Sequence, residues 1–155
     1  MFSHILTPLD GSPLAACVFP HVVAIARATG ARITLLRVLE RSGNSLAGHS
    51  NPFDWQMQKR EAQTYLDEMA EQLLHTVNLP VTTELLEGCA AVQIVEHAQR
   101  TDADLVVLSS HGQGGLSGWH TSSVAHKVIQ RVGTSVLLVR AWRSARRQLS
   151  RTPAL

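Results

Sequence analysis

The stretch from Asp104 to Arg140 reads DLVVLSSHGQGGLSGWHTSSVAHKVIQRVGTSVLLVR. The apolar run at 105–108 is short and branched enough to be a buried strand, and a second such run lies at 136–139. Between them come a glycine-rich loop and a helical pattern with valines four residues apart. Strand, glycine-rich loop, helix and strand together place backbone N–H groups around an anion, usually a phosphate. Glycine-rich loops also serve as plain connections, so the phosphate site is a hypothesis at this point.

Strand and helix patterns alternate along the rest of the chain. Mostly apolar strands are predicted at 5–7 (ended by Pro8), 31–38 and 81–86, with helical patterns between successive strands. This βαβαβαβαβ order predicts an α/β fold, an open parallel sheet covered by helices on both faces. Such sheets bind ligands at the carboxyl ends of the strands, where the strand order reverses. If the first and fourth strands are neighbours, the two loops that follow them converge there, which favours a nucleotide site.

The helix ends can be placed from capping residues. Ser12 followed by proline is a favourable start for the first helix, and Gly30 is a natural stop. Pro20 falls inside this helical pattern, so a kink is expected there. A second, amphipathic helix is predicted from the Asn-Pro pair at 51–52 to about residue 78.

Composition limits the class of protein. The chain has 155 residues, 45% hydrophobic and 17% charged, which fits one folded domain that is neither disordered nor membrane-spanning. No apolar run approaches the roughly 20 residues of a membrane helix. The first residues lack a cationic segment followed by a long apolar run, so a cytoplasmic location is expected. Cys17 and Cys89 are then expected to be free thiols.

The positive charge of the chain is concentrated in its last residues, 141–155. This segment holds four arginines and no acid, and without them the body carries ten basic against twelve acidic residues. A nucleic-acid-binding face on the domain is therefore not expected. The segment itself could contact an acidic partner, although a poorly ordered end is the default for a terminus.

Three motifs resemble those of the universal stress protein family, single-domain type. They are ILTPLDGS at 5–12, ADLVVLSSHGQGGLS at 103–117 and SVLLVR at 135–140, and the resemblance runs from Met1 to about Arg140. It implies an open five-stranded parallel sheet in the order 3-2-1-4-5, similar to the adenine-nucleotide alpha-hydrolase-like folds. It also implies a homodimer formed through the last strand, Ser135 to Arg140.

The family that the chain resembles contains members that bind ATP and members that do not. Family members that bind ATP carry Gly, two residues, Gly, nine residues, then Gly followed by Ser or Thr. The matching positions here are Ser109, Gly112 and Ser122, followed by Ser123. Serine still offers a backbone N–H but resists positive φ and takes up space beside the phosphates. If the loop needs a left-handed backbone conformation at Ser109 or Ser122, the phosphate site is compromised. If it does not, the serine hydroxyls could help to bind the phosphates.

The resemblance also implies which residues would hold ATP with Mg²⁺. Asp10 matches an acid near the ribose, although an Asx-turn with the following amides is the alternative. Pro8, Val38 and Leu108 match apolar positions beside the adenine. His111 could contact a phosphate or simply bond to the backbone. The full expected set is Pro8, Leu9, Asp10, Val38, Leu108, Ser109, His111, Gly112, Gly114, Gly115, Ser122 and Ser123.

Other chemistries find less support in the sequence. There is no G-x-S-x-G elbow, and the adjacent Ser110 and His111 are poorly placed to act as nucleophile and base, so no enzyme is expected. His120 and His126 are six residues apart, not on one helical face, so no zinc site is expected. The remaining alternative is a dimeric stress-response scaffold that binds no nucleotide.

Overall fold

The computed structural model describes residues 1–12, 15–40, 51–110 and 124–140. It contains a five-stranded sheet in the order β3-β2-β1-β4-β5, as the family resemblance implied, and every pairing in it is parallel. The strands are β1 (His4–Pro8), β2 (Arg32–Leu39), β3 (Val81–Glu87), β4 (Leu105–Ser109) and β5 (Ser135–Val139). The helices are η1 (Ala15–Val18, 3-10), α1 (Phe19–Thr29), α2 (Pro52–Val77), α3 (Ala90–Arg100) and α4 (Val124–Arg131).

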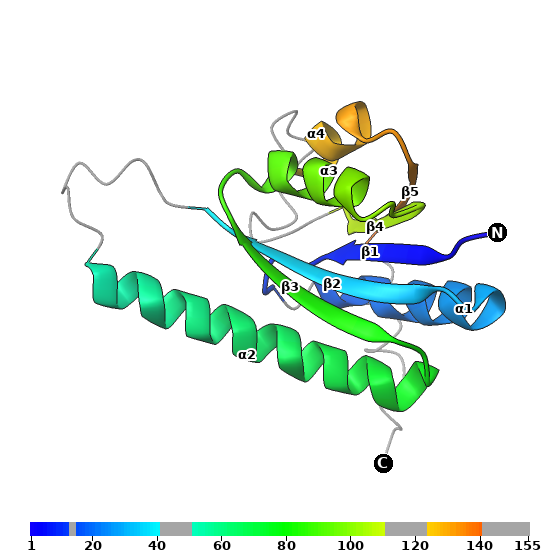
Figure 1. The fold of residues 1–155 in the computed structure, drawn as a ribbon, viewed down its shortest axis with the longest axis horizontal. Helices are drawn as coiled ribbons and strands as arrows, with labels where there is room; N and C mark the ends of the chain where they lie inside the picture. The colour runs from blue at the N-terminus through cyan, green and yellow to red at the C-terminus, as the bar shows by residue number, and fades with distance from the viewer. Residues whose placement is uncertain (13–14, 41–50, 111–123, 141–155) are drawn as a thin grey trace, which may run out of the picture.

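Helices cover both faces of the sheet, with α1 and α2 on one face and α3 and α4 on the other (Figure 1). Successive strand residues point to opposite faces, so Ile5 packs toward α1 and α2 while Leu6 packs toward α3 and α4. Both side chains are fully buried. Because the central strands are buried on both faces, their sequences read as continuous apolar runs rather than alternating ones.

The first helical region differs from the prediction in one respect. Ser12 does cap it, since its Oγ accepts a hydrogen bond from the amide of Ala15 at 3.3 Å. However, the chain first forms the short η1 turn, and α1 starts only at Phe19. Pro20 therefore lies in the first turn of α1, where backbone amides have no intrahelical partner, and the expected kink within a continuous helix is wrong.

Other helix ends agree with their capping residues. Gly30 is left-handed (φ +74°), and its amide donates to the carbonyl of Ala26 at 2.8 Å. Asn51 caps α2 by accepting from the amide of Phe53 at 3.1 Å, and Asn78 ends α2 with φ +50°. Within the ranges that the structure describes, no helix is both long and apolar enough to cross a bilayer. The predicted basic end at 141–155 lies outside these ranges.

Candidate functional site

The site is set by where the strand order reverses. β1 lies between β2 and β4, so the chain leaves β1 toward one side of the sheet and later returns to add β4 on the other. The loops after Pro8 and after Ser109 therefore leave the same edge of the sheet from neighbouring strands. Such a reversal point is where open α/β sheets bind their ligands. The ends of β1 and β4, where the two loops begin, are therefore neighbours, whereas residues 111–123 of the second loop lie outside the described residues.

Residues 9–12, which follow β1, are held by backbone and side-chain hydrogen bonds. Leu9 is 4% exposed, and its amide extends the ladder with β2 by donating to the carbonyl of Leu36 at 2.8 Å. Asp10 Oδ1 accepts the amide of Ser12 at 2.9 Å, which closes an Asx-turn across Gly11. Gly11 takes φ +81°, a conformation that favours glycine. Asp10 thus makes the turn contact and is only half-buried at the sheet edge.

Arg37 and Tyr65 also belong to this loop's surroundings, and the sequence did not point to them. Arg37 lies on β2, with its guanidinium carbon 5.3 Å from the centroid of the Tyr65 ring on α2. A Cβ built on Gly11 would meet Arg37 Nη1 at 1.8 Å, so the guanidinium rests directly on this glycine. Burial raises the pKa of Tyr65; Asp10 raises the pKa further, while Arg37 lowers it. One available indication in the sequence was Arg37 itself, the single charged residue inside the mostly apolar stretch ITLLRVL at 33–39.

The three residues expected beside an adenine do not share one environment. Pro8 and Val38 are half-buried and retain some accessible surface at the ends of β1 and β2. Leu108 is 4% exposed and belongs to the core that β1, β2 and β4 form with α3 and α4. Leu108 therefore offers little surface to a ligand in this conformation.

Ser109 stands where nucleotide-binding relatives are expected to have the first glycine. It is the last residue of β4, opposite Val139 of β5, and the ladder continues as the Ser110 amide donates to the Val139 carbonyl at 2.8 Å. The non-glycine residues with positive φ in the described ranges are Asn78 and Asp102, so Ser109 is not left-handed. The backbone here does not require glycine. The side chain has its own contact, since Cys17 Sγ donates to Ser109 Oγ at 3.7 Å.

Six expected site residues lie outside the described residues. They are His111, Gly112, Gly114, Gly115, Ser122 and Ser123. The other six expected residues lie at or just after the carboxyl ends of the neighbouring strands β1, β2 and β4, so the structure brings them together. They are Pro8, Leu9, Asp10, Val38, Leu108 and Ser109.

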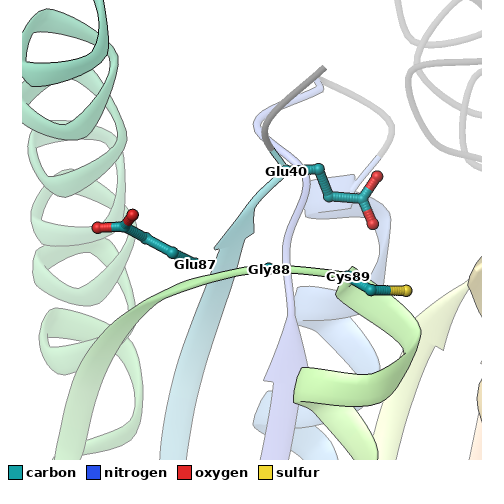
Figure 2. A pocket seen from close by; sticks show the side chains of 4 residues that line it. All are labelled: Glu40, Glu87, Gly88 and Cys89. Carbon is teal, nitrogen blue, oxygen red and sulfur yellow. The ribbon is translucent and has the colours of Figure 1, made fainter. Parts of the chain in front are cut away.

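A cavity of about 560 Å³ opens at the carboxyl ends of β2 and β3. Among the described residues, its lining consists of Glu40, Glu87, Gly88 and Cys89, none of them predicted from the sequence as site residues. Glu40 Oε1 accepts the amide of Ala90, the first residue of α3, at 2.6 Å. Figure 2 shows Glu87 turned toward α2, where it pairs with Lys59, while Glu40 and Cys89 point away from α2. The cavity extends the candidate site along the same sheet edge, beyond Val38.

The electrostatics of this edge are mixed. Asp10, Glu40 and Glu87 carry carboxylates, and Arg37 contributes a guanidinium. Burial raises the pKa of the Cys17 thiol, and the hydrogen bond with Ser109 opposes that shift. Among the residues that the structure places, no three His, Cys, Asp or Glu side chains are grouped closely enough to hold a metal ion by themselves.

Comparison with known proteins identifies the family of this chain. The model of the "Universal stress protein family" matches residues 1–140. The chain belongs to the universal stress protein family. Universal stress protein MJ0531 of Methanocaldococcus jannaschii is 29% identical over 147 residues, covering 90% of this chain and 83% of its own. One from Thermus aquaticus, described as in the QAH/OAS sulfhydrylase 3′ region, is 31% identical over 140 residues, covering 90% and 100%.

Solved structures share the fold of this universal stress protein. Hypothetical protein MJ0577 superposes with a TM-score of 0.78 at 25% identity, covering 90% of this chain and 96% of its own. A universal stress protein in complex with cAMP gives 0.70 at 20% identity, covering 90% and 98%. The Archaeoglobus fulgidus protein in complex with dAMP gives 0.64 at 19% identity, covering 89% and 97%. Two proteins of this fold have thus been solved with adenine nucleotides.

Proposed function

We propose that this universal stress protein binds an adenine nucleotide, ATP with Mg²⁺, and acts as a regulatory protein by binding rather than turnover. The observation that carries the proposal is that β1 and β4 are neighbours at the point where the strand order reverses, so that both loops begin at the same place. One loop presents the Asp10 turn, and the other begins at Ser109 in a conformation that does not need glycine. The structural neighbours solved with cAMP and dAMP support the adenine part of the proposal.

The described residues fit such a ligand in part. Asp10 supplies a carboxylate for a ribose hydroxyl or for Mg²⁺, which prefers oxygen ligands. Pro8 and Val38 supply partly exposed apolar surface for a purine ring. Mg²⁺, when bound, would neutralise phosphate charge. In this proposal the phosphates contact backbone amides at 112–115 and the residues at 122–123, where a glycine-rich chain allows close approach.

We further propose that two copies associate through β5. This strand lies at the edge of the sheet, beside β4. An edge strand presents unpaired backbone groups to another chain, and a two-fold dimer would pair like with like. Val136, Leu137 and Leu138 are only partly buried in the single chain and would gain burial in such a dimer.

Two observations favour a second candidate, a dimeric scaffold of the stress response that binds no nucleotide. Leu108 is buried rather than available to an adenine, and the Ser109 hydroxyl occupies space toward Cys17. A site with less room would exclude the nucleotide without disturbing the fold.

The deciding experiment is the nucleotide content of the purified protein, followed by calorimetric titration with ATP and Mg²⁺. We expect bound adenine nucleotide or micromolar affinity. Gly112→Val should abolish binding with the fold retained, and Asp10→Asn should weaken it. Gly133→Val is the matched control, because no atom lies within 4 Å of a Cβ built there and Gly133 precedes β5, at the ends of the parallel strands opposite the candidate site. An empty protein that takes up no ATP would favour the scaffold.

A further inference from the structure

Arg37 is enclosed between two elements at the edge of the candidate site. The Tyr65 ring lies 5.3 Å from its guanidinium carbon, a cation–π distance. Gly11 contacts the same group closely, because a Cβ there would lie 1.8 Å from Nη1, 2.6 Å from Cζ and 2.8 Å from Nη2. The guanidinium therefore packs between the ring on α2 and the glycine of the β1 loop.

The turn that Arg37 touches is the one that orients Asp10. The Asp10 carboxylate crosses Gly11 to accept the amide of Ser12 at 2.9 Å, so any movement of Gly11 moves this contact. Gly11 at φ +81° is also the residue of the turn with the greatest freedom in the absence of neighbours. A planar guanidinium resting on it removes much of that freedom.

Asp10, Arg37 and Tyr65 lie close together. Asp10 and Arg37 both lie near enough to Tyr65 to act on its hydroxyl in opposite directions. Arg37 Nε and the Tyr65 hydroxyl are buried and make no hydrogen bond within the described part of the chain, so stacking and charge hold the pair together. Lysine, a compact ammonium, would keep the charge but lose the flat contact with the ring and glycine.

We propose that Arg37 is a positioning residue for the ligand site, which clamps the turn at 10–12 against β2 and thereby fixes the carboxylate of Asp10. Tyr65 supports the clamp from α2. This inference rests on the proposed nucleotide site but concerns a residue that does not itself touch the ligand. Without the clamp, the ligand must order the turn when it binds, and the entropy cost of this ordering weakens the affinity.

The test compares Arg37→Met with Arg37→Lys, and each with Arg32→Met. Arg32 lies on the same strand at the opposite edge of the sheet, where it contacts His4 and Thr101, and so is a matched control. We expect Arg37→Met to weaken ATP–Mg²⁺ binding about tenfold, the range for coupled neighbours. Arg37→Lys should recover part of the loss, and Arg32→Met should bind as the wild type does. Equal losses in Arg37→Met and Arg37→Lys would assign the clamp to the flat contact alone, and wild-type affinity in Arg37→Lys would refute a role for that contact.

A double-mutant cycle shows whether Arg37 acts through Asp10. If it does, Arg37→Met adds little to the loss caused by Asp10→Asn, because the carboxylate to be positioned is already gone. Fully additive losses, or unchanged affinity in Arg37→Met, would overturn the proposal. Thermal unfolding of each variant identifies any loss that comes from misfolding.

A second readout separates this inference from the nucleotide proposal. Hydrogen exchange at the Ser12 amide reports the Asx-turn directly and requires no ligand. Arg37→Met should accelerate this exchange several-fold, and Arg32→Met should leave it unchanged. If the wild type binds no nucleotide but Arg37→Met accelerates the exchange, the proposed nucleotide binding is refuted and the proposed clamp by Arg37 is supported. Unchanged exchange at Ser12 in Arg37→Met overturns the clamp whatever the chain binds.

Discussion

The carboxylate of Glu40 accepts a hydrogen bond from the backbone amide of Ala90 at 2.6 Å, joining the end of β2 to the first residue of α3. These residues lie fifty positions apart in the chain. Cys89, the N-cap residue of α3, makes no side-chain hydrogen bond to its helix, so Glu40, which directly follows β2, caps the helix instead.

Glu40→Ala should therefore destabilise the protein by about 1 kcal/mol, the usual effect of losing an N-cap acceptor. Glu40→Gln keeps an oxygen acceptor but loses the charge near the helix dipole, so a smaller loss is expected. Urea unfolding midpoints measure both. Equal stability of Glu40→Ala and the wild type would mean that the hydrogen bond makes no net contribution.

Three glycines allow the contact with Arg37 to be separated from backbone strain. Gly133→Ala should be neutral or stabilising by about 0.5 kcal/mol, since its φ is not left-handed and nothing lies near its Cβ. Gly30→Ala (φ +74°, open space) should lose about 1 kcal/mol from strain alone. Gly11→Ala (φ +81°) must also displace Arg37, so its loss should exceed that of Gly30→Ala by roughly another 1 kcal/mol.

Equilibrium unfolding of the three variants under one condition provides the comparison. The order of stability should be Gly133→Ala, then Gly30→Ala, then Gly11→Ala. Equal losses for the last two would show that Arg37 moves aside without cost.

Acid should weaken the fold through its buried histidines. Burial, followed by nearby Arg100, lowers the pKa of His97, and burial likewise lowers the pKa of His4. The unfolded chain, with histidines near their ordinary value of about 6.5, then binds more protons than the native state. The free energy of unfolding should thus fall as pH drops from about 6.5 toward the lowered native values, by at most about 1.4 kcal/mol per pH unit for each histidine.

His97→Gln should reduce this acid slope, whatever it does to stability at neutral pH. Its Nδ1 lies 2.9 Å from Arg100 Nη2, which can only donate, so the native ring is neutral. His75→Gln is the control, because that side chain is 79% exposed on α2. Unfolding followed from pH 5 to 8 compares the slopes; an unchanged slope in His97→Gln would assign the acid sensitivity to His4 or to other groups.

The two cysteines should react at different rates with a thiol reagent. Cys89 is exposed in the cavity at the strand ends, whereas Cys17 is half-buried and burial raises its pKa. Because only the thiolate attacks, Cys17 should react more slowly. Cys89→Ser should remove the fast phase and Cys17→Ser the slow one. Two equal rates would contradict the assignment.

The same reaction tests where a nucleotide would lie. If ATP with Mg²⁺ extends into the cavity beside Val38, it should slow the fast phase of Cys89. Nucleotide binding without protection of Cys89 would place the adenine on the other side of Val38.

The fold was largely accessible from the sequence because the central strands β1, β2 and β4 are buried on both faces, and the resulting apolar runs are hard to mistake. Helix ends with strong capping residues, such as Gly30 and Asn51, were also placed well. Pro20 was interpreted wrongly because a proline inside a helical pattern and a proline at a new helix start look alike in sequence. The unpredicted η1 turn before it decides the matter.

The candidate site was accessible only where consecutive residues build it. Asp10 and Ser109 stand next to the ends of predicted strands, so their place at the sheet edge followed from strand order alone. Arg37 and Tyr65, or Glu40 and Ala90, come from separate elements and meet only through tertiary packing. No spacing rule links such pairs. Leu108 shows the reverse case, since a matching motif position does not reveal how deeply a side chain is buried.

Tyr65 is the single tyrosine of the chain. Its stacking on Arg37, close to Asp10, gives the molecule an intrinsic optical reporter at the point where a ligand would act. Tyrosinate absorbance during an alkaline titration arises from this one ring, without labels and without overlap from a second phenol. A ligand that shifts the charge balance between Asp10 and Arg37 should displace that titration curve. Compounds could therefore be screened against this protein in an ordinary spectrophotometer.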